Sequence, residues 1–460
     1  MPTHSSGSQV VLDQCIIHGF GYLGSRITGL IQGTRHVQKT WNSVDSLPFT
    51  IVAIVERNPH RRATAQACHP EIPCFDDIEA ALAVAVGPTT FIKDFTSPHG
   101  RRRLLDLAQR AGVPVLLEKP LSSPGIEMPL REYADIASVS MSEAFNPVIH
   151  ALANKLASDA AEITSFAFAR VNSLTLERLR EASARPDIVG GAFVDKLSHD
   201  VHLLTFGALL KSTDVDFGSP QIQEVAYDLR VNQDATSLSF SSLNGESLSP
   251  VDIEAPDCNP SKMMVDFTMQ VKLDGRPIPT RWVASWGGMP SNLAARLDIS
   301  EAHVEAARMI SKSENTSYPR SNPKLIVCEY INPAGEEVQL IANLQARGAV
   351  NAWLVERRNG AEYLHPVQYS VSIIKSMEAF SKSFGAGGYL DLEGIEKADR
   401  ATLKIRSGFR KPLAEELQVE RSLAILDRNH STGHGMDVPK ASPEPVFSER
   451  GSPLEVRGSG

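Results

Sequence analysis

A lysine just beyond an apolar run is the residue whose position most suggests chemistry. The run Val113–Leu117 continues into Glu118, Lys119 and Pro120. A lysine is costly to bury, and the proline restricts the residue before it to an extended backbone. At the carboxyl end of a parallel strand, Lys119 would point into the crevice where open α/β sheets bind ligands. The pattern predicts a positioned cation that can donate a hydrogen bond to a reacting oxygen.

A second set of reactive side chains lies later in the chain. On a helix, Asp195, His199 and His202 fall at positions i, i+4 and i+7 and share one face. His199 could act as a general base, with Asp195 orienting it or the substrate. The same three side chains could instead bind a metal, but no further ligand is obvious, and we expect no metal. Lys196 and Asp200 are expected to pair across one helical turn on the adjoining face.

A glycine-rich turn near the amino terminus offers a place for phosphate groups. It consists of Gly19, Phe20, Gly21, Tyr22, Leu23 and Gly24, between a predicted strand and a predicted helix. Gly19 would allow the tight turn, Gly21 the approach of a pyrophosphate, and Gly24 close packing of helix on strand. The free N–H groups at the helix start, around Tyr22 and Leu23, would face the phosphates. The sequence therefore predicts dinucleotide binding, with a ligand-free turn as the alternative.

The end of the second predicted strand bears on which dinucleotide binds. Glu56 follows the strand at 49–55 and could accept hydrogen bonds from the adenosine ribose, which favours NAD(H). Arg57, together with Arg61 and Arg62, could instead hold a 2′-phosphate, so NADP(H) remains possible. A solvated strand end is the alternative interpretation of Glu56.

The next two strand ends are expected to line the same crevice. Thr96, Ser97, Pro98 and His99 follow one strand, and Glu118, Lys119 and Pro120 follow the other. Ser97 could cap the next helix, with Pro98 in its first turn, and capping alone would also explain these residues. The basic triplet at 101–103 opens that helix, and we expect it to be solvated.

Alternating strands and helices must position these groups. Strands are predicted at 10–18, 49–55, 90–95, 113–117 and 139–145, and helices at 22–33, 77–86, 99–111 and 129–137. This alternation predicts an α/β fold with a doubly wound parallel sheet, a Rossmann dinucleotide-binding domain at 10–146.

The pattern changes after about residue 146. Helices are predicted at 149–160, 190–210, 370–386 and 391–407, and strands at 163–171, 221–231, 263–273, 281–285 and 324–331. We therefore expect an α+β substrate and oligomerisation domain at 147–415, with a large, mainly antiparallel open sheet and helices on one face. The segment 420–460 is rich in Pro, Ser, Gly and charge and is expected to be a disordered tail.

Composition narrows the class of protein. The chain has 460 residues, a net charge of −8 and five cysteines. The acidic balance argues against nucleic acid or a membrane surface as partner. Scattered cysteines, no signal-like amino terminus and no long apolar stretch favour a cytoplasmic protein.

In combination, the motifs resemble the Gfo/Idh/MocA family of NAD(P)-dependent oxidoreductases. The resemblance covers residues 10 to about 410 and rests on Gly19–Gly24, Thr96–Pro98, Glu118–Pro120 and Gly190–His199. It implies a Rossmann domain, a carboxy-terminal domain with an open antiparallel sheet, an active site between them, and a homo-oligomer formed through that sheet.

The resemblance also implies roles for single residues. Lys119 and His199 would be catalytic, Asp195 would contact the substrate or His199, and the Lys119-Pro120 peptide would be a candidate cis bond. These residues and His202 would bind the small-molecule substrate. Leu197 and His202 depart from common residues of the family, and its usual basic residue near 146–147 is absent, so the substrate is not specified.

The expected reaction is hydride transfer between nicotinamide and a secondary alcohol or ketone of a sugar, polyol or sugar-like substrate. His199 would exchange the hydroxyl proton while Lys119 stabilises the developing alkoxide. Two alternatives remain open: reduction of a C=N bond on the same fold, and a regulator that binds dinucleotide without turnover.

Overall fold

The computed structural model describes residues 11–33, 49–122, 128–159, 161–171, 191–205, 209, 215–218, 221–224, 229–231, 238–240, 264–285, 292–309, 323–344, 352–367, 372–384 and 392–408. These residues all lie within one compact unit, Met1–Ala414. The expected tail at 420–460 and the residue Gly190 lie outside the described residues.

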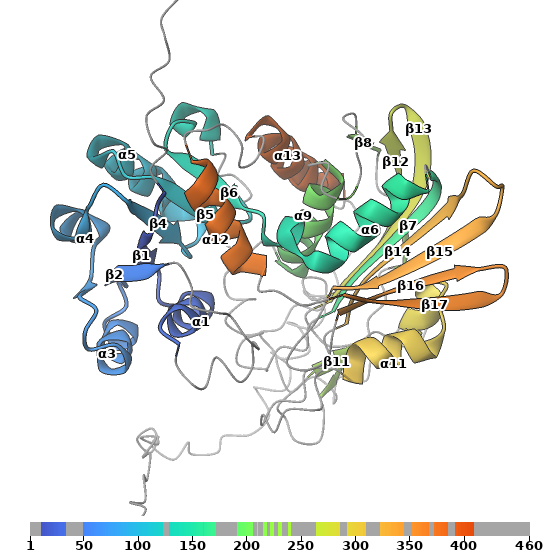
Figure 1. The fold of residues 1–460 in the computed structure, drawn as a ribbon, viewed down its shortest axis with the longest axis horizontal. Coiled ribbons are helices and arrows are strands. Elements are labelled where there is room, and N and C mark those ends of the chain that lie inside the picture. Colours follow the sequence, from blue (N-terminus) through green and yellow to red (C-terminus); the bar gives the residue numbers. More distant parts are fainter. Residues whose placement is uncertain are drawn as a thin grey trace, which may run out of the picture. The chain divides into compact units, whose positions relative to one another are not determined.

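The amino-terminal part forms a six-stranded parallel sheet with the order β3-β2-β1-β4-β5-β6 (Figure 1). The strands are β1 (Gln14–His18), β2 (Thr50–Val55), β3 (Cys74–Phe75), β4 (Thr90–Asp94), β5 (Val115–Glu118) and β6 (Ala137–Ser140). The helices between them are α1 (Tyr22–Ile31), α3 (Pro59–Cys68), α4 (Ile78–Ala85) and α5 (Arg101–Ala111). The strand order reverses between β1 and β4, which puts the glycine-rich turn at the switch point of the sheet. The predicted Rossmann-type sheet is confirmed.

Two local predictions in this part were wrong. The segment expected as a helix at 129–137 holds only the short 3₁₀ helix η2 (Leu130–Tyr133). The following strand β6 begins at Ala137, because Val115 pairs with Ala137 in the parallel ladder, and a second 3₁₀ helix, η3 (Ser142–Phe145), replaces its predicted end. Helix α3 was not predicted, although its Asn58 cap and Pro59 are a recognisable start signal.

The second sheet has nine strands and contains one parallel pair, β7 with β13, among antiparallel neighbours (Figure 1). Its strands are β7 (Glu162–Val171), β8 (Val215–Phe217), β9 (Gln221–Glu224), β12 (Met264–Leu273), β13 (Arg276–Ser285), β14 (Lys324–Ile331), β15 (Glu337–Asn343), β16 (Ala352–Arg358) and β17 (Ala361–Val367). Strands β10 (Leu229–Val231) and β11 (Leu238–Phe240) pair separately. This confirms the predicted large, mainly antiparallel sheet.

Helices lie on both faces of this sheet. Helices α6 (Pro147–Ser158), α9 (Gly191–Thr205) and α13 (Leu392–Gly408) share an apolar core with Phe168 and its neighbours. Helices α10 (Leu293–Arg296) and α11 (Glu301–Met309) share another with Ala169 and its neighbours. Successive strand residues point to opposite faces, and here both sets are apolar, so both faces need cover. The expectation of helices on one face only was therefore wrong.

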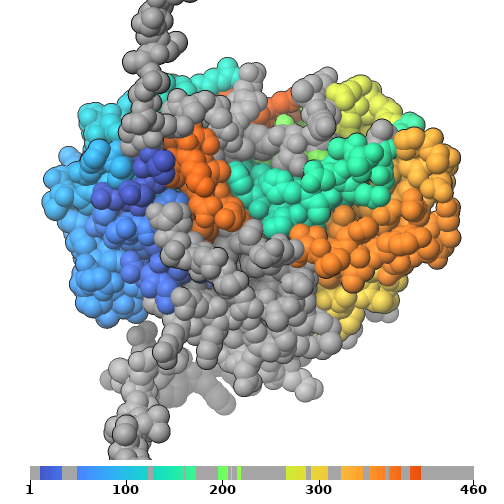
Figure 2. Space-filling view, in the orientation of Figure 1, coloured from blue at the N-terminus to red at the C-terminus, as the bar shows by residue number. Residues whose placement is uncertain are grey.

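Helix α12 (Ser372–Ser383) returns to the parallel sheet (Figure 2). Its residues Ile374, Met377 and Phe380 join a buried cluster with Ile17 and Phe91 of the central strands. The carboxy-terminal part of the chain thus completes the core around β1 and β4. None of the helices within the described residues is long and apolar enough to cross a membrane.

Candidate active site

The glycine-rich turn has the close packing that its glycines predict. Gly19 has a φ of +95°, in the region that favours glycine, and its N–H donates to the carbonyl of Val55 at 2.8 Å. A Cβ on Gly24 would lie 2.0 Å from the carbonyl oxygen of Gly19. Helix α1 starts at Tyr22 with no side-chain cap on its first N–H groups. These groups are therefore suited to an anion such as a pyrophosphate.

Glu56 links the end of β2 to this turn. Its Oε2 accepts from the N–H of Phe20 and its Oε1 from the N–H of Asn58, both at 2.8 Å. The carboxylate is buried, yet each oxygen can accept a further bond. The guanidinium of Arg61 approaches Gly21, with Nη1 3.9 Å from the position of a Cβ there. An acid and a cation thus both lie beside the glycine-rich turn.

Asp94 organises the next strand end. It is fully buried and accepts from Nδ1 of His18 at 2.9 Å, from Oγ1 of Thr96 at 2.7 Å and from Nε of Arg101 at 3.2 Å. Burial alone would raise the pKa of Asp94, but the hydrogen bond and charge of His18 and the charge of Arg101 lower it well below its ordinary value. Asp94 therefore joins the ends of β1 and β4 to the start of α5.

Arg101 corrects the expectation that the basic triplet is solvated. Its side chain is 1% exposed, whereas those of Arg102 and Arg103 are 68% and 66% exposed. Besides Asp94, it donates to the carbonyls of Thr96 at 3.1 Å, Leu121 at 3.3 Å and Pro120. The short 3₁₀ turn η1 (Pro98–Gly100) comes directly before Arg101, which is the first residue of α5. The side chain of Arg101 contacts the loops that follow β4 and β5. One arginine thus fixes two loops of the crevice.

The other residues of the loop after β4 are Ser97, Pro98 and His99. Ser97 precedes η1 but makes no side-chain capping bond, so its predicted capping role was wrong. Pro98 is buried at the start of η1, and His99 is exposed. Their contact with a cofactor stays a prediction.

Replacing Arg101 by methionine should lower the free energy of unfolding by ~3–5 kcal/mol, because it leaves the Asp94 carboxylate buried without its guanidinium. Urea unfolding followed by fluorescence measures this loss. The exposed neighbour provides a matched control, since Arg102→Met should change stability by less than ~0.5 kcal/mol. Equal and small effects of the two substitutions would show that Arg101 does not hold these loops.

Lys119 is held at the end of β5. The Lys119-Pro120 peptide is cis, as the family resemblance implied. Its Nζ donates to Oδ1 of Asp195 at 2.8 Å and to the carbonyl of Asp195 at 2.7 Å. Just before it, Glu118 pairs with Lys93, a fully buried lysine that lies over the ring of Phe95. An ammonium has three donors, so within the described residues one N–H of Lys119 is left for a substrate oxygen.

Asp195 is shared by two lysines. Lys196 Nζ lies 2.9 Å from its Oδ2, on the other side of the carboxylate from Lys119. Burial would raise the pKa of Asp195, but the two ammonium groups lower it well below its ordinary value. The predicted Lys196–Asp200 pair was wrong, because Asp200 binds Arg170 instead, at 2.6 Å.

His199 lies on the same helix, α9, one turn after Asp195. Burial and then the positive charges of Lys119 and Arg170 lower the pKa of His199 well below its ordinary value. The imidazole is therefore neutral near pH 7 and can accept a proton. His202 is 2% exposed, and burial with the charge of Lys119 lowers its pKa to about 3. Across the described ranges, no group of three His, Cys, Asp or Glu side chains is arranged to hold a metal ion.

A buried ion network behind His199 was missed from the sequence. Arg170 of β7 binds Glu143 at 3.0 Å and Asp200 at 2.6 Å, and Lys324 of β14 lies 3.3 Å from the same Glu143 oxygen. The four residues come from chain segments that are far apart in sequence. The available signal was Arg170 itself, a charge placed inside the apolar run at 163–171.

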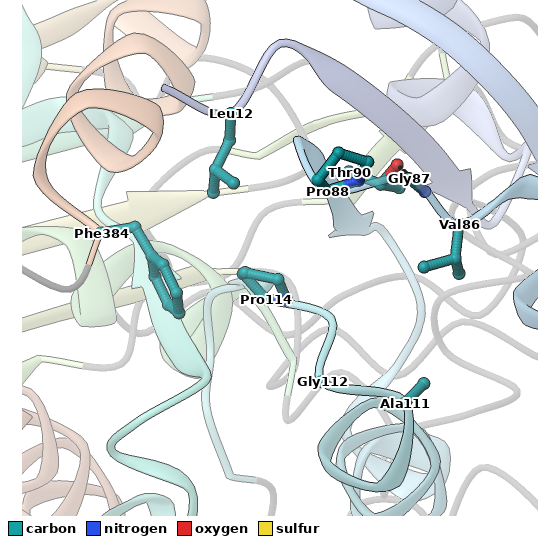
Figure 3. Close-up of a pocket in the computed structure, with 9 residues that line it drawn as sticks. All are labelled: Leu12, Val86, Gly87, Pro88, Thr90, Ala111, Gly112, Pro114 and Phe384. Carbon is teal, nitrogen blue, oxygen red and sulfur yellow. Dashed lines mark hydrogen bonds between the residues drawn. The ribbon is translucent and has the colours of Figure 1, made fainter. Parts of the chain in front are cut away.

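A separate hollow of about 580 Å³ lies at the amino ends of the parallel strands, opposite the strand ends described above (Figure 3). Leu12, Thr90 and Pro114 line it at the amino ends of β1, β4 and β5, with Val86 and Phe384 beside them. None of its lining residues is an acid, a base or a thiol, so it offers no group for catalysis.

Comparisons with known proteins bear on the fold. No protein-family model matches the chain, and no curated protein matches it. The 3-ketoreductase KijD10 from Actinomadura kijaniata, solved with NADP and TDP-benzene, is 14% identical with a TM-score of 0.54, over 86% of this chain and 97% of that one. The UDP-N-acetylglucosamine 3-dehydrogenase GnnA from Acidithiobacillus ferrooxidans is 14% identical with a TM-score of 0.50, over 86% and 98%. An oxidoreductase from Desulfitobacterium hafniense, described as NADPH-dependent, is 10% identical with a TM-score of 0.54, over 87% and 96%. At these identities the likeness shows a common fold.

Proposed function

We propose that the protein is an NAD(P)-dependent oxidoreductase of the Gfo/Idh/MocA type. It would transfer a hydride between nicotinamide and a secondary alcohol or ketone of a sugar, polyol or sugar-like substrate. The observation that carries the proposal is the Lys119 ammonium, held by Asp195 on the helix that also bears a neutral His199. In this proposal residues 10–146 bind the dinucleotide and residues 147–415 bind the substrate.

The residues present fit a dinucleotide. The uncapped start of α1 suits the pyrophosphate, and the close approach of Gly24 to the Gly19 carbonyl packs this helix start tightly against the end of β1. Thr96, Glu118 and Pro120 lie at the adjoining strand ends. A bound nicotinamide would supply or accept the hydride, while the protein supplies binding and orientation.

The proton chemistry follows from the protein's own side chains. In alcohol oxidation, His199 accepts the hydroxyl proton, because its lowered pKa keeps the imidazole neutral. The third N–H of Lys119 donates to the same oxygen and stabilises the developing alkoxide. Asp195 fixes Lys119 through two hydrogen bonds, one to its carboxylate and one to its carbonyl. Reduction of a ketone uses the same groups in the reverse order.

NADP(H) is the better-supported form of the cofactor, which revises the preference for NAD(H) drawn from Glu56. The guanidinium of Arg61 lies beside Gly21, with Nη1 3.9 Å from the position of a Cβ there. A guanidinium at this place can bind a 2′-phosphate. The solved complexes of KijD10 contain NADP.

Replacing Arg61 by alanine should therefore raise the Kd for NADPH by about tenfold to a hundredfold, because one charge-assisted contact to phosphate is lost. Its effect on NADH should be less than about threefold. Fluorescence titration of each dinucleotide measures both values, with Arg102→Ala as the control for a lost surface charge. A variant that weakens neither dinucleotide, or both alike, would refute the role of Arg61.

The function itself is tested by following dinucleotide absorbance with a panel of keto-sugars, polyols and cyclic imines. We expect turnover with keto-sugars or polyols. Turnover with imines alone would favour the C=N reductase. Tight dinucleotide binding with no turnover on the whole panel would favour a regulator.

The proposal also includes a homo-oligomer formed through the nine-stranded sheet. Helices α10 and α11 pack on the face of that sheet turned away from α9. Light scattering of the purified protein gives its mass in solution and decides between a monomer and an oligomer.

A further inference from the structure

His18 and Asp94 form a pair that the mechanism above does not use. His18 is the last residue of β1, Asp94 is the last residue of β4, and the two face each other across the parallel ladder. The strand order reverses between these two strands, so the pair lies at the switch point of the sheet. Open α/β sheets bind dinucleotides across the crevice at this point, with the pyrophosphate at the start of the first helix.

The contact with Asp94 orients the imidazole of His18. Its Nδ1 lies 2.9 Å from Oδ1 of Asp94. The lowered pKa of Asp94 keeps its carboxylate ionised near pH 7, and a carboxylate only accepts, so Nδ1 carries a proton. Asp94 has other donors for both of its oxygens, from Thr96 to Oδ1 and from Arg101 to Oδ2. The pair therefore fixes the direction of the ring more than it satisfies the acid.

The rest of the imidazole ring is accessible. The side chain of His18 is 18% exposed, whereas that of Asp94 is 0% exposed. Because Asp94 covers Nδ1, the exposed surface belongs to the part of the ring that carries Nε2. Within the described residues, Asp94 is the one side-chain partner of this imidazole. Gly19 and the uncapped start of α1 follow directly in the chain, so His18 adjoins the place assigned above to the pyrophosphate.

The protonation of His18 depends on the charges that neighbouring elements bring to this edge of the sheet. These are Asp94 on β4, Arg101 on α5, Glu56 after β2, Arg61 on α3, and the Lys93–Glu118 pair on β4 and β5. The first turn of α1 adds no acid. A pyrophosphate would add two negative charges beside the ring and favour its protonated form. An imidazole changes its charge most readily near neutral pH.

We propose that His18 is a further dinucleotide-binding residue, whose imidazole takes up a proton from solvent on binding and donates from Nε2 to the pyrophosphate. This inference rests on the proposed function and adds a contact that the glycine-rich turn does not supply. The backbone N–H groups of that turn can bind phosphate at any pH, whereas His18 donates from Nε2 only when it is protonated. Dinucleotide affinity should therefore rise as the pH falls through the range in which imidazole titrates.

Proton uptake tests this contact directly. Calorimetric titration with NADPH at pH 7, in buffers of different ionisation enthalpy, gives the protons taken up on binding. The wild-type protein should take up about half a proton more than His18→Asn, which keeps an N–H for Asp94 but has no atom in place of Nε2. The difference between the proteins is the readout, because the 2′-phosphate can itself take up a proton. Bound ADP-ribose, which has a pyrophosphate but no 2′-phosphate or nicotinamide, should show the same difference.

The affinities should follow the same pattern. His18→Asn should raise the Kd for NADPH by about tenfold at pH 6, as expected for one charge-assisted contact, and by less than about threefold at pH 8.5. His18→Gln, with an uncharged N–H near the position of Nε2, should lose the proton uptake but keep part of the affinity. His150→Asn, at an exposed position of α6, is the matched control and should keep both. Thermal unfolding of each variant checks that it is folded.

Equal proton uptake in the wild-type protein and in His18→Asn would overturn the inference and leave the proposed function intact. A loss of affinity that is the same at pH 6 and pH 8.5 would do so as well. A difference in uptake with NADPH but not with bound ADP-ribose would also overturn it, because the contact would then not be with the pyrophosphate. If the wild-type protein bound neither ligand, the proposed function would fail, and this inference with it.

Discussion

Replacing Lys119 by alanine should lower kcat by ~100-fold or more, because the developing alkoxide loses its positioned donor in a largely dry site. Dinucleotide affinity should change little, since the turn at Gly19–Gly24 and Glu56 is untouched. Stopped-flow absorbance at saturating dinucleotide and substrate measures kcat, and fluorescence titration measures the dinucleotide Kd.

A lysine at the surface provides the control for this substitution. Lys375 of α12 is half exposed and pairs only with Glu378 among the contacts described for it. Lys375→Ala should leave kcat within about twofold, as expected for a surface substitution. If Lys119→Ala kept near-normal turnover, the role assigned to Lys119 would be wrong, whatever its effect on stability.

Replacing His199 by asparagine should lower kcat/KM for alcohol oxidation by ~10²–10⁴-fold, the usual contribution of a positioned general base. The pH profile should also change. Since the folded pKa of His199 lies well below its ordinary value, activity should fall only when the pH drops through that lowered pKa. At neutral pH the wild-type imidazole is already in its basic form.

In His199→Asn, the residual activity should no longer fall at the low pH at which His199 takes up a proton in the wild-type protein; this fall is the acid limb of the pH profile. Measuring kcat/KM across the pH range for both proteins separates a base from a structural residue, because a structural role lowers the rate without removing a titration. Persistence of the same acid limb in the variant would assign it to another group, with Asp200, whose pKa burial raises to about 6, as the first candidate.

The sequence was informative where backbone geometry restricts the residue type. Gly19 needs a positive φ, and Gly24 cannot carry a Cβ beside the Gly19 carbonyl. Such restrictions are local, so the glycine-rich turn, its strand and its helix could be predicted together. The position of Lys119 could be predicted in the same way, because Pro120 restricts the backbone of the residue before it.

The partners of charged side chains could not be predicted, because they depend on tertiary packing. Lys196 was expected to bind Asp200 one turn away, but it binds its neighbour Asp195. Within a basic triplet only Arg101 is buried, and only the positions of the Thr96 and Pro120 loops explain which one. The contacts of Arg101 join segments that sequence periodicity treats separately.

The helix expected at 129–137 failed for a related reason. Its apolar spacing suits a helix, but the parallel pairing of Ala137 with Val115 starts a strand there. Likewise, helices α10 and α11 were not foreseen, although strands such as β7 carry apolar residues on both faces. A strand that is apolar on both faces needs cover on both sides, and that is a usable sequence signal.

The central claim, hydride transfer beside Lys119 and His199, is tested most directly by isotope transfer. The protein is incubated with NADPH deuterated at the transferring position of the nicotinamide and with the keto-sugar panel, and the products are examined by mass spectrometry. The account predicts one deuterium on the new carbinol carbon, and its loss in Lys119→Ala and His199→Asn. Deuterium that stays on the dinucleotide with every ketone tested, while the dinucleotide is bound, would contradict it.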